Sequence, residues 1–206
     1  KTIKKVILNG IDHRVYYPTN KKKNAKIVIL FVARIVPRKG LLYLLKAFKN
    51  LLKKTKNIKL TVLGDGPQLS TCMKYARIHN FKKYINFKGY IIGKEKIRSY
   101  QEADIFCAPY RNEAFGLTLL EAMAIGVPIV SFKNSAFKEI LKDYPYQELL
   151  VKPKDTNKLA EALSKLINNE KMRKELSSWE IKESKKYSWK KVAKETEEFY
   201  YQILNK

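Results

Sequence analysis

The sequence predicts an α/β fold, a Rossmann-like doubly wound parallel sheet with helices on both faces. Short apolar runs alternate with segments whose apolar residues recur at helical spacing, over most of the 206 residues. About six strands alternating with helices favour a parallel sheet, because parallel neighbours are joined by helical crossovers. Apolar residues make up 45% of the chain, which is enough for a sizeable core.

The predicted strands are short apolar runs that end near turn residues. The clearest is the unbroken run at residues 27–33, which is typical of a strand buried on both faces. The other predicted strands cover residues 58–63, 84–87, 105–108, 127–130 and 148–151. A basic, strand-like piece covers residues 1–8, and a polar run from residue 19 to residue 26 predicts an exposed connection.

The predicted helices fill the intervals between these strands. In residues 41–54, Leu41, Leu44, Leu45 and Phe48 recur at helical spacing and form one apolar face. The remaining predicted helices cover residues 68–79, 94–103, 117–124 and 137–141, followed by three closing helices at residues 156–168, 170–187 and 189–204.

A formal net charge of +24 indicates an anionic partner, which could be nucleotide phosphate, nucleic acid or acidic lipid. A lysine-rich proteome would give the same count as solvated surface. Cys72 and Cys107 lie far apart and fit neither a metal motif nor a disulfide framework, so a reducing compartment is expected. The longest apolar run is far below the roughly 20 residues of a membrane span. Because Lys1 is not a natural start, we expect a fragment.

Residues 112–130 are the most informative stretch. They follow a predicted buried strand, pass through a polar turn and enter a predicted helix. In open α/β sheets, ligands bind at the carboxyl ends of the strands, and the N–H groups of a helix N-terminus favour anions. Gly116 allows close approach to the backbone there. Glu113 and Glu121 flank this turn, so two carboxylates border a predicted phosphate site.

The loop at residues 34–40 is a second candidate phosphate site. It brings Arg34, Arg38 and Lys39 to the carboxyl end of the first buried strand. Arginine presents a planar fork to phosphate oxygens and lysine a compact charge. Alone, this loop would be read as basic surface; together with the Gly116 turn at the same sheet edge, it favours a diphosphate site.

An ordered series of short motifs resembles one family. The series comprises Asn9-Gly10-Ile11-Asp12, Ala33-Arg34 with Lys39-Gly40, Gly64-Asp65-Gly66-Pro67, Phe87-Lys88-Gly89-Tyr90, Ala103-Asp104-Ile105 and the Glu-x-Phe-Gly-x-x-x-x-Glu stretch from Glu113 to Glu121, which continues to Pro128. It is similar to the C-terminal, donor-binding domain of retaining GT-B fold glycosyltransferases of the group 1 family, which includes phosphatidylinositol mannosyltransferases and sucrose synthases.

The resemblance implies a role for each matching residue. Arg34 and Lys39 would hold the donor diphosphate, Glu113 would face the sugar, and Glu121 would accept hydrogen bonds from the ribose hydroxyls. The backbone at Phe115, Gly116 and Leu117 would meet sugar and phosphate, and Tyr90, Ile91 and Ile92 would cover the base. No metal is implied and no cofactor is required; the donor would be a UDP- or GDP-linked sugar. The Gly64-Asp65-Gly66-Pro67 segment is interpreted only as a tight turn.

The sequence departs from the family pattern at two places. Asn134-Ser135-Ala136 stands where the family often has a glycine pair, and Tyr144-Pro145-Tyr146-Gln147 replaces the usual Asn-Gly turn. Neither segment touches the expected diphosphate motif, so we expect different contacts only at the rim of the site.

The whole chain is interpreted as a single nucleotide-sugar-binding domain. Residues 1–26 would lead in from an interdomain hinge, residues 27–187 would form the core, and residues 188–206 would form a closing helix. The resemblance implies an N-terminal acceptor domain that is missing here. It also suggests a cytoplasmic enzyme, and the charge suggests peripheral contact with the inner face of the cell membrane, an anionic surface, and a lipid-linked acceptor.

Two other classes compete with this interpretation. A nucleotide-sugar epimerase or a phosphorylase could share the fold, but the motif around Glu121 disfavours both. The charge alone would fit a basic nucleic-acid-binding module, which would bind with a steep dependence on salt. The phosphate loops predict saturable nucleotide binding instead, and no nucleic acid is expected as a partner.

Overall fold

A computed structural model describes residues 5–20 and 25–204 of the chain. Its six strands form one parallel sheet in the order β3-β2-β1-β4-β5-β6, which confirms the predicted doubly wound fold. The strands are β1 (Ile27–Val32), β2 (Ile58–Leu63), β3 (Ile85–Gly89), β4 (Ile105–Ala108), β5 (Ile129–Phe132) and β6 (Leu150–Val151).

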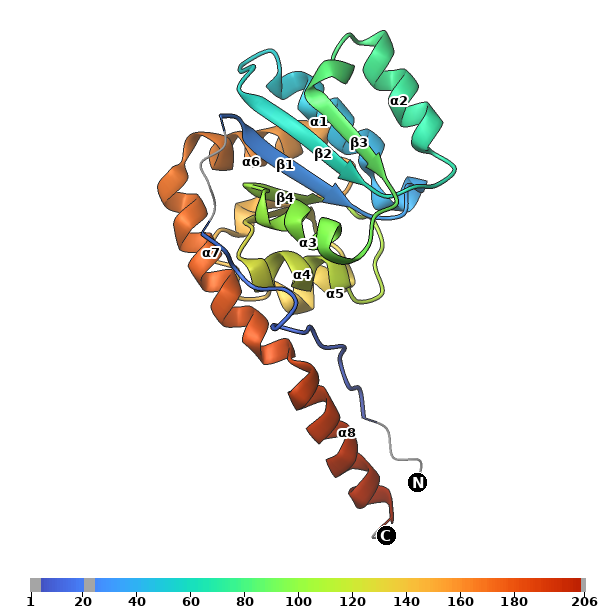
Figure 1. Cartoon of the computed structure of the whole chain (residues 1–206), viewed down its shortest axis with the longest axis vertical. Helices are drawn as coiled ribbons and strands as arrows, with labels where there is room; N and C mark the ends of the chain where they lie inside the picture. Colours follow the sequence, from blue (N-terminus) through green and yellow to red (C-terminus); the bar gives the residue numbers. More distant parts are fainter. Residues whose placement is uncertain (1–4, 21–24, 205–206) are drawn as a thin grey trace.

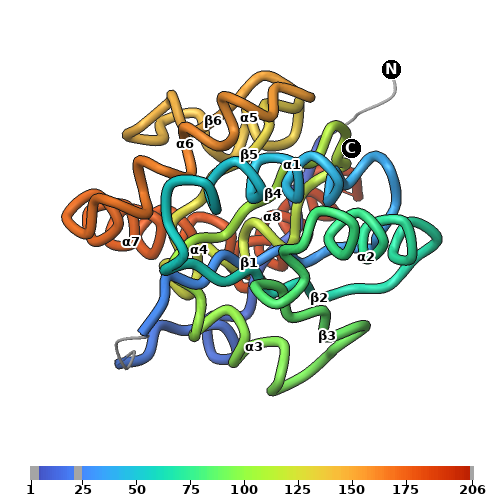
Figure 2. Tube along the Cα trace, turned by 90° about the horizontal axis from the view of Figure 1, so that it is seen from above, coloured from blue at the N-terminus to red at the C-terminus, as the bar shows by residue number. Residues whose placement is uncertain are grey.

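Helices cover both faces of this sheet (Figures 1 and 2). Helices α1, α2 and α6 lie on one face, and α3, α4 and α7 lie on the other. The helix bounds are α1 (Leu41–Leu51), α2 (Leu69–Ile78), α3 (Gly93–Gln101), α4 (Leu117–Ile125), α5 (Ser135–Ile140), α6 (Thr156–Asn168), α7 (Glu170–Ser184) and α8 (Trp189–Leu204). The two layers explain why β4 is apolar and buried along its length and why β1 is apolar and buried from Ile29 to Val32.

Several element boundaries differ from the prediction. The strand expected at residues 127–130 begins at Ile129, because Gly126 and Val127 both donate their N–H groups to Ala122 O and so complete the end of α4. The first long helix ends at Leu51 rather than residue 54. The strand-like piece predicted at residues 1–8 is absent from residues 5–8, and residues 1–4 lie outside the described part of the chain.

The last helix, α8, extends away from the body of the domain (Figure 1). None of its described residues is buried. The N-terminal segment meets its base, where Ile11 N donates to Tyr187 O at 2.7 Å and Ile11 bridges to Ser188. Within the described residues, no helix is both long enough and apolar enough to cross a membrane.

The strand order reverses between β1 and β4, the two central strands of the sheet. The loops after these strands leave in opposite directions, so a crevice opens at their carboxyl ends. Those loops contain the two segments that the sequence marked as phosphate sites. The topology therefore brings Arg34 and Glu113, from distant parts of the chain, to one edge of the sheet.

Candidate functional site

Glu121 lies on α4 beneath the crevice and is 7% exposed. Its carboxylate accepts hydrogen bonds from Tyr16 Oη at 2.9 Å, Lys96 Nζ at 2.6 Å and Tyr100 Oη at 2.8 Å. The lysine supplies a compensating charge to this nearly buried carboxylate. Burial, followed by the negative charge of Glu121, raises the pKa of Tyr100 well above its usual value, so its hydroxyl stays a donor.

The loop after β1 presents two cations of different kinds. Arg34 is exposed and lines the cavity described below. Lys39 is only 12% exposed at its side chain; it forms an ion pair with Glu113, and its ammonium lies 4.4 Å from the centroid of the Tyr110 ring. The structure therefore brings together the predicted residues Lys39 and Glu113. Arg34 is the more available cation of the two.

Helix α4 begins at Leu117, shortly after Glu113, the acid of this ion pair. Gly116 is the N-cap, with a left-handed φ of 103°, and a Cβ there would lie 2.6 Å from Phe137 Cε1. Gly116 O accepts from Leu119 N and Leu120 N, so the helix hydrogen bonding begins with these two amides. The amides before them have no acceptor inside the helix and can meet an anion. Phe115 packs against the core, and Leu117 is exposed.

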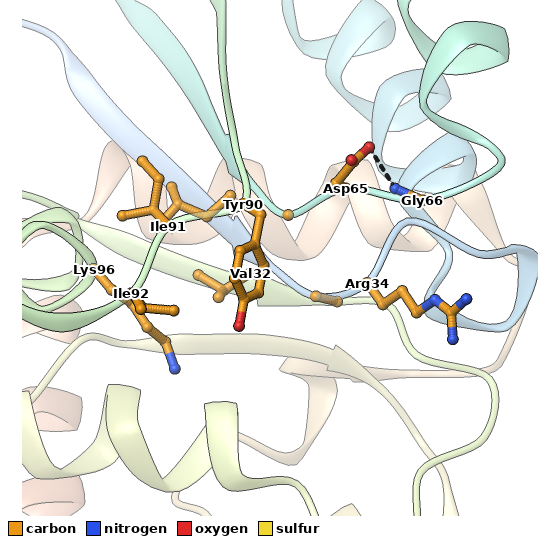
Figure 3. Close-up of a pocket in the computed structure, with 11 residues that line it drawn as sticks. Val32, Arg34, Asp65, Gly66, Tyr90, Ile91, Ile92 and Lys96 are labelled. Atoms are coloured by element: carbon orange, nitrogen blue, oxygen red, sulfur yellow. Dashed lines mark hydrogen bonds between the residues drawn. The ribbon is translucent and has the colours of Figure 1, made fainter.

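A cavity of about 520 Å³ lies above the carboxyl ends of β1 and β2 (Figure 3). Its wall includes Arg34 from the loop after β1, the segment from Tyr90 to Ile92 before α3, and Lys96 on α3. Tyr90 and Ile92 are 77% and 67% exposed, so they form a rim rather than part of the core. The volume is typical of a site for a ligand of nucleotide size.

The Gly64-Asp65-Gly66 segment also lines this cavity, although the sequence marked it only as a turn. A Cβ at Gly64 would lie 1.9 Å from Ala33 O, so the loops after β1 and β2 are in close contact. Asp65 O accepts from Ile35 N at 2.8 Å, and its carboxylate accepts from Gly66 N at 2.7 Å. The turn therefore shapes the cavity wall and fixes the loop that carries Arg34.

Three partners of the predicted residues were missed by sequence reasoning. Tyr16 reaches Glu121 across 105 positions of sequence, and no local pattern signals that contact. Lys96 and Tyr100 are one turn apart on α3, a spacing that places both on one helix face and could have marked them. Across residues 5–20 and 25–204, no three His, Cys, Asp or Glu side chains gather as a metal site would require.

The sequence resembles enzymes that transfer sugars. Residues 16–182 match the family Glycosyl transferases group 1. A phosphatidyl-myo-inositol mannosyltransferase of Mycobacterium leprae is 30% identical over 174 residues, which cover 84% of this chain and 46% of that protein. The chain spans about half the length of the curated relatives it matches.

Solved structures share the fold. Sucrose-phosphate synthase from Thermosynechococcus elongatus matches 98% of this chain and 53% of its own, with a TM-score of 0.85 and 23% identity. The HepE protein of Anabaena, solved in complex with UDP and glucose, matches 97% of this chain and 56% of its own, with a TM-score of 0.81 and 17% identity. Fold and motifs together define a glycosyltransferase domain of the GT-B type. The chain belongs to the Glycosyl transferases group 1 family.

Proposed function

We propose that this chain binds a nucleoside diphosphate sugar, linked to UDP or GDP, and that the complete enzyme transfers its sugar to an acceptor with retention of configuration. One observation carries the proposal. The cavity has in its wall the exposed cation Arg34 and Lys96, the partner of Glu121, and the N-terminus of α4 lies at the same edge of the sheet. These features match the chemical requirements of a nucleoside diphosphate sugar, whose diphosphate needs cations and free N–H groups.

Each part of the donor has a partner in this assignment. Glu121 accepts from the ribose hydroxyls, and Tyr90 and Ile91 cover the base. Arg34, Lys39 and the first amides of α4 neutralise the diphosphate and stabilise the charge that builds on it as the sugar leaves. In this role they take the part that a metal ion plays in other phosphate sites. Glu113 holds Lys39 and faces the sugar.

The acceptor is proposed on different grounds, from the relatives of this chain and not from its cavity. Because the chain spans about half of its relatives, we propose that acceptor binding and transfer belong to the longer protein. We propose a lipid-linked acceptor because two relatives have lipid-related names, the phosphatidyl-myo-inositol mannosyltransferase and an alpha-monoglucosyldiacylglycerol synthase. Chain 1–206 should therefore bind donor without transferring sugar at the rate of the longer protein, which a radiolabelled transfer assay on both would measure.

The proposal is tested by titrating the chain with uridine and guanosine, with their diphosphates, and with the diphosphate sugars. Arg34→Ala should weaken diphosphate binding about ten- to a hundredfold, because a charge-assisted hydrogen bond contributes roughly 1.5–3 kcal/mol. Nucleoside binding should hardly change. Arg34 is a cleaner choice than Lys39, since removing Lys39 would leave Glu113 unpaired next to the phosphates.

The matched control is Arg38→Ala on the same loop. Arg38 is exposed and does not line the cavity, so its loss should leave diphosphate affinity within about threefold, as expected for a screened surface charge. Equal losses for nucleoside and diphosphate in Arg34→Ala, or equal losses in the two arginine variants, would refute the phosphate assignment.

A further inference from the structure

The edge of the sheet opposite the donor cavity is strongly basic. Lys26 precedes β1, Lys56 precedes β2, and Lys82 and Lys83 precede β3, while Lys59 is the second residue of β2. These strands are parallel neighbours, so their amino ends lie side by side, as the tails of the three arrows in Figure 1 show. We call these five exposed lysines the basic edge. The fold gathers them from three separate segments of sequence.

Three of these lysines surround one tyrosine. The ammonium groups of Lys26, Lys56 and Lys83 lie 5.5, 5.9 and 5.5 Å from the centroid of the Tyr84 ring. Their mutual separations are therefore comparable to the Debye length of about 10 Å at moderate salt, and they repel one another. A ring can offset only part of that repulsion at an exposed site.

No carboxylate among the described residues forms an ion pair with the basic edge. A groove of about 320 Å³ beside it is lined by Lys26, Lys59, Lys88 and one acid, Glu102, which pairs with Arg98 at 2.7 Å. On the closing helices, by contrast, Lys158 and Lys174 each pair with a glutamate on the same helix. Among the described residues, the basic edge therefore lacks the carboxylate partners that these lysines have.

We propose that the basic edge binds the surface of an acidic lipid bilayer. All five cations are lysines, whose compact charges suit lipid phosphates and carboxylates on a plane. Specific nucleic-acid recognition draws instead on arginine forks, and single-stranded binding needs free aromatic faces. Tyr84 is half-buried and surrounded by lysines, so it offers no such face. The strands separate this surface from the donor cavity, so a bound bilayer leaves the cavity open.

The test is sedimentation of the chain with vesicles of phosphatidylserine and phosphatidylcholine, and with vesicles of phosphatidylcholine alone. The edge variant carries Lys26→Gln, Lys59→Gln and Lys83→Gln; Lys56 is kept because it also donates to Leu52 O at the end of α1. Each lysine near an acidic leaflet strengthens binding about fivefold, so the variant should bind acidic vesicles on the order of a hundredfold more weakly. Pure phosphatidylcholine should bind neither protein.

The matched control carries Lys138→Gln, Lys142→Gln and Lys152→Gln, three exposed lysines near β5 and β6 at the other side of the sheet. It has the same net charge as the edge variant and should bind acidic vesicles much better. Equal losses of vesicle binding in the two variants would mean that binding depends only on net charge, and would overturn the proposal. Tighter binding to duplex DNA than to acidic vesicles at the same salt, lost in the edge variant only, would assign the edge to nucleic acid instead.

Folding and donor binding of both variants are measured as controls. Both variants should retain the wild-type melting temperature and nucleotide affinity, since none of the six lysines lines the donor cavity. If the edge variant does not fold, hydrogen exchange on the wild-type chain gives a second measurement: acidic vesicles should slow exchange in residues 53–59 and 81–84. Unchanged exchange there, with vesicles bound, would also overturn the proposal. Failure of nucleotide binding would leave it standing.

Discussion

Two buried carboxylates on adjacent, packed helices contrast in a useful way. Glu121 on α4 and Glu180 on α7 are 7% and 0% exposed, and each meets the hydroxyl of a buried tyrosine, Tyr100 and Tyr144 respectively. Glu121 also has the ammonium of Lys96, which lines the donor cavity. Glu180 forms no ion pair within the described residues. A buried glutamate paired with a tyrosine thus occurs in two different settings, one next to a cation at the cavity and one without an ion pair in the described part of the chain.

The surroundings of Glu180 favour the neutral form of its carboxyl group. Burial raises its pKa well above the usual value. The hydroxyl oxygen of Tyr144 lies 2.9 Å from Ile129 O and 3.0 Å from Glu180 Oε1, yet it has one proton to donate. A protonated Glu180 can donate to the hydroxyl oxygen while the hydroxyl donates to Ile129 O. The cluster therefore ties α7 to the start of β5, and charge would disrupt it.

The comparison teaches that a nearby cation and access to a cavity separate a binding carboxylate from a structural one. Burial alone does not, since both residues are buried.

The largest expected effect is on stability, from Glu180→Ala. This change removes one of the two acceptors of Ile129 N, the other being Tyr144 Oη. It also removes the carboxyl partner of Tyr144 and leaves a cavity between α7 and β5. We expect a loss of about 3 kcal/mol in the free energy of unfolding, measured by urea denaturation. Nucleotide affinity of the folded protein should be unchanged. A loss below about 1 kcal/mol would mean that the cluster contributes little.

The next effect is on ligand choice, from Glu121→Gln. The amide keeps the shape but loses the negative charge that pairs with Lys96. We expect affinity for a ribonucleoside diphosphate to fall by about tenfold or more, and affinity for the deoxyribose analogue to fall much less. Calorimetric titration of both ligands measures the difference. Glu180→Gln should change neither affinity; a matching change would remove the distinction between the two sites.

A smaller effect concerns pH. Because the pKa of Glu180 is raised in the folded protein, its contribution to stability is full below the unfolded pKa of about 4.3 and is lost as pH rises through the folded value. Glu180→Gln removes this loss. The melting temperature of the variant relative to the wild type should therefore increase from about pH 5 to about pH 8, by a few degrees for each 1–2 kcal/mol. A constant difference would show that Glu180 is ionised in the fold.

These contrasts also show what the sequence could and could not predict. The parallel doubly wound sheet was predictable, and so were the two loops at its carboxyl edge, because apolar period, glycines and cations are local signals. Glu121 was marked by its motif, but its contact with Tyr16, 105 positions away, depends on how the N-terminal segment crosses α3 and α4. Glu180 had no signal at all: on a charged helix, one more glutamate looks like surface, and only packing against β5 makes it a buried acid.

The smallest expected effect comes from Tyr16→Phe. It concerns how the Glu121 carboxylate can accept hydrogen bonds from two ribose hydroxyls. A carboxylate has about four acceptor sites, and three are occupied by Tyr16, Lys96 and Tyr100. Two ribose hydroxyls need two sites, so one protein donor must give way. Tyr100 is fully buried and Lys96 provides the charge, whereas Tyr16 is half-buried in a segment before β1.

We therefore expect Tyr16→Phe to raise the preference for ribose over deoxyribose by about two- to fivefold, since one neutral hydrogen bond contributes roughly 0.5–1.5 kcal/mol. Tyr17→Phe is the matched control, because the neighbouring ring is 51% exposed and no described contact joins its hydroxyl to Glu121. A fall in ribose preference, like that expected for Glu121→Gln, would mean that Tyr16 orients the carboxylate for the ligand. The N-terminal segment would then be part of the donor site rather than a competitor for it.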